Sequence, residues 1–192
     1  MEALLLLLAG AVLALVGYWL WTRYFGFAAQ SVDDYSDLVP VLHLRDHLTG
    51  RLTCDGMIFG PTGRVTSRFR ADMNVAWDGP NGVMDELFHY DDGSTQERQW
   101  RLTIGTDGSV RAEADDVIGA GHGTVGGNAL GLRYRIRLPE ANGGHVLDAV
   151  DWMYLQRDGT ILNRSQFRKF GIRVAELFCT MRPAPTEEND DA

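Results

Sequence analysis

The segment from Arg64 to Asp78 alternates between apolar and polar side chains, and this period of two constrains the fold more than any other feature of the chain. A helix repeats every 3.6 residues and cannot produce the pattern, whereas a half-buried strand does. The apolar face holds Val65, Phe69, Ala71, Met73, Val75 and Trp77, and the polar face holds Arg64, Thr66, Arg68, Arg70, Asp72 and Asn74. The segment from Leu132 to Leu138 alternates in the same way, with arginines between its apolar residues.

Three similar turn signals separate the predicted strands: 91–93 (Asp-Asp-Gly), 106–108 (Thr-Asp-Gly) and 157–159 (Arg-Asp-Gly). Each is typical of a three-residue hairpin loop in which glycine takes the left-handed position. Together with the alternation, these turns predict about nine antiparallel strands in an up-and-down order. An open sheet of that length would leave two unpaired edges, so the sequence predicts closure into a barrel.

The turns also predict the register of three neighbouring strands. A three-residue loop at 91–93 pairs Glu86 with Arg98 and Met84 with Trp100, and the loop at 106–108 pairs Arg98 with Asp116. Trp100 then faces Ala114. This face also carries Phe88, Leu102 and Ile104, so we expect it to point into the barrel. The predicted group of two carboxylates and one guanidinium fits a structural ion network and the polar end of a ligand pocket equally well.

A glycine-rich stretch runs from Asp115 to Ala129, with Gly119, Gly121 and Gly123 at every second position. Such a face leaves room for a ligand, a bend or another backbone. Gly121–Gly126 matches the dinucleotide fingerprint G-x-G-x-x-G, but the next residues alternate as a strand where that fingerprint requires a helix, which excludes this site. Asp115 and Asp116 point to opposite faces of an extended chain, so they cannot form one catalytic pair.

Several motifs resemble those of a bacterial envelope family of unknown function, many of whose members are described as lipoproteins with lipocalin-like barrels. They are LTGRLTCDGMIFGPTGRVTSRF, DELFHYDDG, RQW, ADDVIGAGHGTVGGNALGLRY, DWMYLQRDGTILNRS and KFGIRV, in this order between Tyr35 and Arg182. The resemblance implies a lipocalin-like fold and an envelope location but no particular activity. No cysteine follows the N-terminal apolar run, so this chain lacks the acylation site of the lipoproteins.

The residues from Ala3 to Trp21 carry no charge and are long enough to cross a bilayer as a helix. The rival interpretation, a cleaved signal peptide, is disfavoured because Glu2 replaces the usual basic residues and the cleavage site is poor. We therefore expect a transmembrane anchor (1–24), a linker (25–35), a barrel domain (36–182) and a disordered acidic tail (183–192). The envelope resemblance places the barrel on the periplasmic side of the inner membrane, although Arg23 alone favours the opposite side.

The sequence contains few signals of nucleic-acid binding, metal binding or nucleophilic catalysis. The formal net charge of −8 argues against nucleic-acid binding. His43 and His47 lack a third metal ligand at a usable spacing, and no nucleophile motif occurs, so we expect no metal, no cofactor and no catalytic residues. Cys54 lies in the first predicted strand and Cys179 in the last, which permits either a disulfide or two buried thiols.

The sequence thus predicts an all-β lipocalin-like barrel behind one transmembrane helix. The predicted function is non-catalytic binding of an apolar or amphipathic, lipid-like molecule. The expected ligand-binding residues are Glu86, Arg98, Trp100, Asp116, Asn128, Tyr134 and Trp152. Two alternatives remain open at this point: a structural module of an envelope assembly, and an enzyme acting on an envelope lipid. A strongly perturbed buried carboxylate favours the enzyme, whereas a ligand-sized cavity favours both binding and catalysis.

Overall fold

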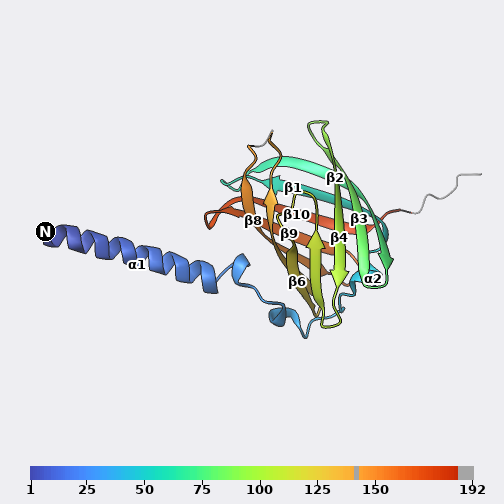
Figure 1. Cartoon of the computed structure of the whole chain (residues 1–192), viewed down its shortest axis with the longest axis horizontal. Helices are drawn as coiled ribbons and strands as arrows, with labels where there is room; N and C mark the ends of the chain where they lie inside the picture. Colours follow the sequence, from blue (N-terminus) through green and yellow to red (C-terminus); the bar gives the residue numbers. More distant parts are fainter. Residues whose placement is uncertain (141–142, 186–192) are drawn as a thin grey trace, which may run out of the picture.

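The computed structural model, which describes residues 1–140 and 143–185, has one long helix followed by a closed β-barrel (Figure 1). Helix α1 (Glu2–Tyr24) is followed by two 3-10 turns, η1 (Phe27–Ala29) and η2 (Val32–Tyr35), and by the short helix α2 (Leu44–His47). The strands are β1 (Gly50–Phe59), β2 (Val65–Asp78), β3 (Asn81–Tyr90), β4 (Thr95–Ile104), β5 (Ser109–Glu113), β6 (Gly121–Gly126), β7 (Ala129–Arg137), β8 (Val146–Leu155), β9 (Ile161–Lys169) and β10 (Ile172–Pro183).

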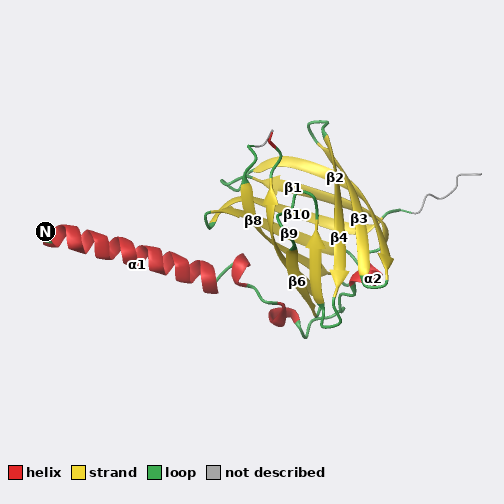
Figure 2. Cartoon of the chain, in the orientation of Figure 1, coloured by secondary structure: helices red, strands yellow, loops and turns green. Residues whose placement is uncertain are grey.

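Each strand pairs antiparallel with the next strand in sequence, and β10 pairs with β1 to close the barrel (Figure 2). This confirms the predicted fold class and the up-and-down order. The structure has ten strands where about nine were expected, because the glycine-rich segment is broken. Gly119 takes a positive φ of 76° before β6 begins at Gly121, so β5 and β6 are separate strands.

The three predicted hairpin loops are present, and a shared hydrogen-bond pattern explains them. Gly93, Gly108 and Gly159 all have φ near +80°. In each loop the preceding aspartate accepts a hydrogen bond from the backbone N–H two residues later, at 2.8–3.1 Å. The aspartate side chain therefore stabilises each turn. This fixes the loop length and, with it, the register of the flanking strands.

The space beside the glycine face is taken by a neighbouring strand. A Cβ on Gly123 would lie 2.3 Å from the carbonyl oxygen of Gly131 in β7, and one on Gly121 would lie 3.0 Å from the Cβ of Tyr134. Two of the three uses open to such a face are found here: Gly119 serves a bend, and Gly121 and Gly123 allow the close approach of β7.

Helix α2 closes one end of the barrel with leucines. Leu42, Leu44 and Leu48 are almost completely buried in the main core. The indole of Trp77 donates a hydrogen bond of 2.8 Å to the Leu48 carbonyl, which attaches the helix to the end of β2. Burying such side chains stabilises by about 1.5–3 kcal/mol each, so α2 is an integral part of the barrel.

The segment expected to be a linker instead packs on the outside of the barrel. Phe27 forms a second apolar cluster with Ala129, Val150 and Trp152, against which Val32 and Tyr35 also pack. Tyr154 donates a hydrogen bond of 2.8 Å to Gln30, and the Leu42 N–H donates one of 2.8 Å to the Gly127 carbonyl. These contacts join the end of α1 to the barrel wall by a short, well-packed connection.

Candidate functional site

The barrel encloses a cavity of about 90 Å³ whose wall is mostly apolar and rich in sulfur. The sulfur-containing residues that line it are Met73, Met84, Met153, Met181, Cys54 and Cys179. Thioether side chains are flexible and adapt to differently shaped neighbours. Polar groups enter from two directions, Glu86 and Arg98 from β3 and β4, and Asp151, Asn163 and Ser165 from β8 and β9.

The predicted register of β3 and β4 is confirmed. Glu86 lies opposite Arg98 and Met84 lies opposite Trp100. Strand β4 also pairs with β5 in the predicted register, but only from Arg101 to Ile104, because β5 ends at Glu113. Trp100 and Ala114 therefore fall beyond the paired part of the two strands.

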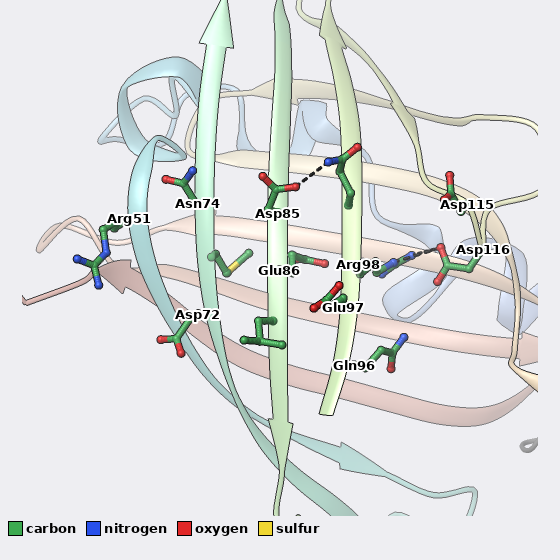
Figure 3. Close-up of a pocket in the computed structure, with 13 residues that line it drawn as sticks. Arg51, Asp72, Asn74, Asp85, Glu86, Gln96, Glu97, Arg98, Asp115 and Asp116 are labelled. Atoms are coloured by element: carbon green, nitrogen blue, oxygen red, sulfur yellow. Dashed lines mark hydrogen bonds and ion pairs between the residues drawn. The ribbon is translucent and has the colours of Figure 1, made fainter. Parts of the chain in front are cut away.

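Arg98 reaches Asp116 even though Asp116 lies past the end of β5. The guanidinium donates hydrogen bonds from Nε (3.2 Å) and Nη2 (3.0 Å) to one carboxylate oxygen of Asp116 (Figure 3). The side chains are 16% and 26% exposed, so this ion pair is largely shielded from water. No backbone hydrogen bond joins residues 95–100 to residues 114–120, all of which the structure describes, so this side-chain pair connects the two segments where the sheet is unpaired.

Glu86 is the unusual member of the group. Its residue is 8% exposed, and its Oε2 has no hydrogen-bond partner in the part of the chain that the structure describes. Burial is the main cause that raises the pKa of Glu86 to about 7. Arg98 opposes the shift, and the nearby Asp151 and Asp116 add to it. Such a shift is expected, because buried carboxylates that share one guanidinium cannot all stay charged without a further donor.

A second polar group on β8 and β9 was missed by the sequence analysis. The Asp151 carboxylate, which is 7% exposed, accepts hydrogen bonds from Ser165 (2.8 Å) and Asn163. The pKa of Asp151 is raised by burial, and these two hydrogen bonds oppose the shift. The signal available in sequence was that Asp151 shares one strand face with Leu147, Ala149, Met153 and Leu155.

Trp100 and Tyr134 complete the polar side of the cavity. Their rings meet edge to face with centroids 5.4 Å apart, and the Arg98 guanidinium stacks over the Trp100 ring at 4.2 Å. Burial, together with the neighbouring carboxylates, raises the pKa of the Tyr134 phenol, so this group stays protonated at physiological pH.

Two expected site residues lie elsewhere. Trp152 points to the outer face of β8, where the 27–35 segment covers it, so it does not line the cavity. Asn128 lies in the turn between β6 and β7, and its amide donates to the Leu155 carbonyl at 3.4 Å. Asn128 therefore does not line the cavity, contrary to its expected place in the binding site.

The buried thiols are close to each other but unjoined. Cys54 and Cys179 are both free. Contact with the Cys54 thiol and burial raise the pKa of Cys179 well above its ordinary value, and its Sγ donates a weak hydrogen bond of 3.5 Å to Asn163. Of the two alternatives left open by the sequence, the structure has two buried thiols.

A polar groove of about 820 Å³ lies on the other side of the same wall. Met73, Glu86 and Arg98 line both this groove and the interior cavity. Exposed carboxylates dominate the groove: Asp72, Asp85, Glu97 and Asp115. The described residues contain no group of three His, Cys, Asp or Glu side chains placed to hold a metal ion.

The family model described as protein of unknown function (DUF3833) matches residues 22–183. The chain belongs to the DUF3833 family. No curated protein matches it.

Solved structures similar to this DUF3833 protein share its fold at low sequence identity. The S-type phycobiliprotein lyase CPES from Guillardia theta is 7% identical, with a TM-score of 0.54 over 74% of this chain and 91% of that one. Rv2717c from M. tuberculosis is 17% identical, with a TM-score of 0.55 over 78% and 100%. A DUF3598 protein of unknown function from Nostoc punctiforme is 10% identical, with a TM-score of 0.50 over 76% and 51%. These likenesses support the lipocalin-like fold alone.

The shielded Arg98–Asp116 pair and the exposed Arg101–Asp115 pair beside it provide a matched test. Arg98→Met should reduce the free energy of unfolding by about 1.5–3 kcal/mol, since it leaves the shielded Asp116 carboxylate without the two hydrogen bonds from Arg98. Arg101→Met should cost less than about 1 kcal/mol, because Asp115 is 95% exposed. Chemical denaturation of both variants measures the difference, and equal losses would contradict the structural role given to Arg98.

Glu86 should make stability depend on pH. Its pKa is about 7 in the folded protein against an ordinary 4.5, so the folded state keeps a proton that the unfolded state has released. Its contribution is fully present below about pH 4.5 and is lost as pH rises through 7, by on the order of 3 kcal/mol. Denaturation at pH 5 to 8 should show this loss in the wild type and in Glu97→Gln, which changes an exposed residue of β4. If the free energy of unfolding changed with pH in the same way for the wild type and Glu86→Gln, the role given to Glu86 would be contradicted.

Proposed function

We propose that this DUF3833 protein is a membrane-anchored barrel that binds a small amphipathic molecule in its interior without converting it. The observation that carries the proposal is the Glu86 Oε2 atom, which is buried in an apolar cavity and has no donor among the described residues. An unpaired buried polar group costs about 1–3 kcal/mol. A guest that brings both a donor and apolar atoms removes that cost and fills the cavity.

The size and lining of the cavity limit the guest. By comparison with a cavity of about 150 Å³ that binds benzene, a volume of 90 Å³ holds about four non-hydrogen atoms. A longer apolar tail requires side chains to move, and the four methionines of the wall are suited to such rearrangement. The polar head of the guest therefore enters the cavity first, and its apolar tail fills the space that opens when the methionine side chains move.

Helix α1 supports membrane attachment. The span Glu2–Trp21 is long and apolar enough to cross a bilayer, and none of it is buried against the barrel. A signal sequence is also long and apolar enough. We favour an uncleaved anchor over a cleaved signal peptide because the cleavage site is poor and Glu2 is acidic. We place the helix in the inner membrane with the barrel in the periplasm, as the resemblance to envelope proteins implies.

Catalysis is the second candidate, and two observations favour it. A carboxyl group with a pKa of about 7 is poised to give and take protons at neutral pH. One protein of similar fold is a phycobiliprotein lyase. Glu86 and Asp151 would then act on the bound molecule as acid and base.

Methionine methyl resonances offer a direct test of binding. Of the six methionines, Met73, Met84, Met153 and Met181 line the cavity, whereas Met57 lies on the outer face and Met1 at the start of the chain. With the full chain in lipid nanodiscs, 1-propanol should shift the four cavity signals and leave the signal of Met57 unchanged.

Two variants show whether the cavity itself is occupied. Leu102→Trp fills the cavity and should abolish the shifts, whereas Leu87→Trp, on the outer face of β3, should preserve them. The proposal fails if 1-propanol leaves the cavity signals unmoved, or if the shifts persist in Leu102→Trp.

A further inference from the structure

Carboxyl groups outnumber cations around the cavity. Glu86, Asp116 and Asp151 face a single guanidinium, that of Arg98, and the phenol of Tyr134 stays neutral. Asp116 reaches Arg98 from outside the cavity lining, and the other described side chains that line the cavity are apolar, aromatic, hydroxyl, amide or thiol groups. The site therefore offers an excess of hydrogen-bond acceptors and negative charge.

Arg98 is already committed to protein partners. One edge of its guanidinium is hydrogen-bonded to Asp116, and one face lies on the Trp100 ring. An anionic head that used the Nε–Nη2 edge of Arg98 would have to displace Asp116, and an anionic head at any edge would lie close to Glu86 and Asp151. Like charges at such short range in a poorly hydrated site disfavour that arrangement.

The donors on the opposite wall are also committed. Ser165 and the Asn163 amide both donate to the same oxygen of Asp151, and the amide also donates to the Trp152 carbonyl. Asp151 is therefore satisfied by its neighbours, whereas Glu86 retains a free acceptor that faces the cavity.

We infer that the head of the bound molecule is a hydrogen-bond-donating cation, a primary amine or similar group, held by Glu86, and that carboxylate amphiphiles are rejected. This inference rests on the proposed binding function and specifies the class of ligand. A charge-assisted hydrogen bond from an ammonium group supplies the donor that Glu86 lacks and balances one of the surplus charges.

Propylamine and propionate provide matched probes, with 1-propanol as the neutral reference. At pH 8 propylamine should bind at least tenfold more tightly than propionate, measured by the cavity methionine shifts of the full chain in nanodiscs. Affinity for propylamine should rise between pH 6 and pH 8 as Glu86 ionises in the field of Arg98, Asp116, Asp151 and Tyr134, while the amine stays protonated.

Glu86→Gln should bring propylamine to within about threefold of 1-propanol, and Glu97→Gln should leave the preference unchanged. Continued binding of 1-propanol by Glu86→Gln shows that the variant is folded. Propionate binding as tightly as propylamine overturns the inference but leaves the proposed function standing. Failure of all three probes overturns both.

A second, independent observation concerns the hairpin between β9 and β10. Its tip exposes Phe170 (91%) and Ile172 (62%), and Phe170 has a positive φ of 53° that turns the tip. Arg168 and Lys169 adjoin them, and neither has a carboxylate within ion-pairing distance in the described chain. Both contact neutral groups instead: Arg168 donates to Gln166 and to the Gly171 carbonyl, and Lys169 contacts His145. Exposed apolar side chains beside basic residues that no carboxylate neutralises are typical of segments that enter a membrane interface.

The geometry points to insertion of this hairpin into the interface of the bilayer that α1 crosses. The hairpin lies at the barrel end opposite α2, and in Figure 1 its red-orange tip projects toward the side on which α1 extends, above the end of that helix in this view. Lys169 and Arg168 would meet anionic headgroups, each contributing about 1 kcal/mol. This inference rests on the proposed anchoring by α1.

Spin labels on the full chain in phosphatidylglycerol-containing nanodiscs test this placement. A label at Phe170→Cys should be more accessible to oxygen than to a water-soluble nickel reagent, and a label at Arg157→Cys, on the opposite barrel end, should show the reverse. A label at Leu8→Cys reports on α1 separately. Equal water exposure at 170 and 157 with Leu8→Cys in the bilayer overturns the hairpin placement alone, and a water-exposed Leu8→Cys overturns the anchor with it.

Discussion

Closure of the sheet between β1 and β10 is the constraint on which the rest of the molecule depends. Ten antiparallel strands joined by short loops have two edges, and the pairing of residues 52–59 with residues 176–183 removes both. Closure turns one face of every strand toward the interior of the barrel. The side chains on these faces fill most of the interior and leave no large empty space. Leucines in and beside α2 close one end, so what remains is a narrow cavity with a mainly apolar wall.

Charged groups inside such a barrel have to find partners in the wall itself. Arg98 and Asp116 do so where β4 and the segment after β5 lack backbone hydrogen bonds, so an ion pair connects the wall in place of the sheet. Asp151 is paired with Ser165 and Asn163. Glu86 is the exception, and its raised pKa is the physical consequence of burying a carboxyl group with an oxygen that no described residue satisfies. We infer a binding site for a cationic head from that imbalance.

Much of this arrangement was predictable from the sequence, because it depends on local rules. Period-two alternation identified the strands, and the aspartate-glycine turns fixed loop length, so the pairing of Glu86 with Arg98 and the contact of Arg98 with Asp116 followed. Trp152 was misplaced because both faces of β8 are mostly apolar, and Asn128 was misplaced because its bond to the Leu155 carbonyl depends on a contact between the β6–β7 turn and the end of β8. The outer face is covered by residues 27–35, and no local pattern shows that a segment far away in sequence will pack there. The Asp151 group was missed for a related reason, since it requires the pairing of β8 with β9 to be known.

The measurement that tests this account most directly is the titration of the Glu86 side-chain carboxyl carbon by nuclear magnetic resonance, assigned with Glu86→Gln. The buried, unpaired carboxyl group should titrate with a midpoint near pH 7, and saturation with propylamine should move that midpoint to lower pH because the ammonium group stabilises the charged form. A midpoint near 4.5 that propylamine leaves unchanged would contradict both the imbalance and the site built on it.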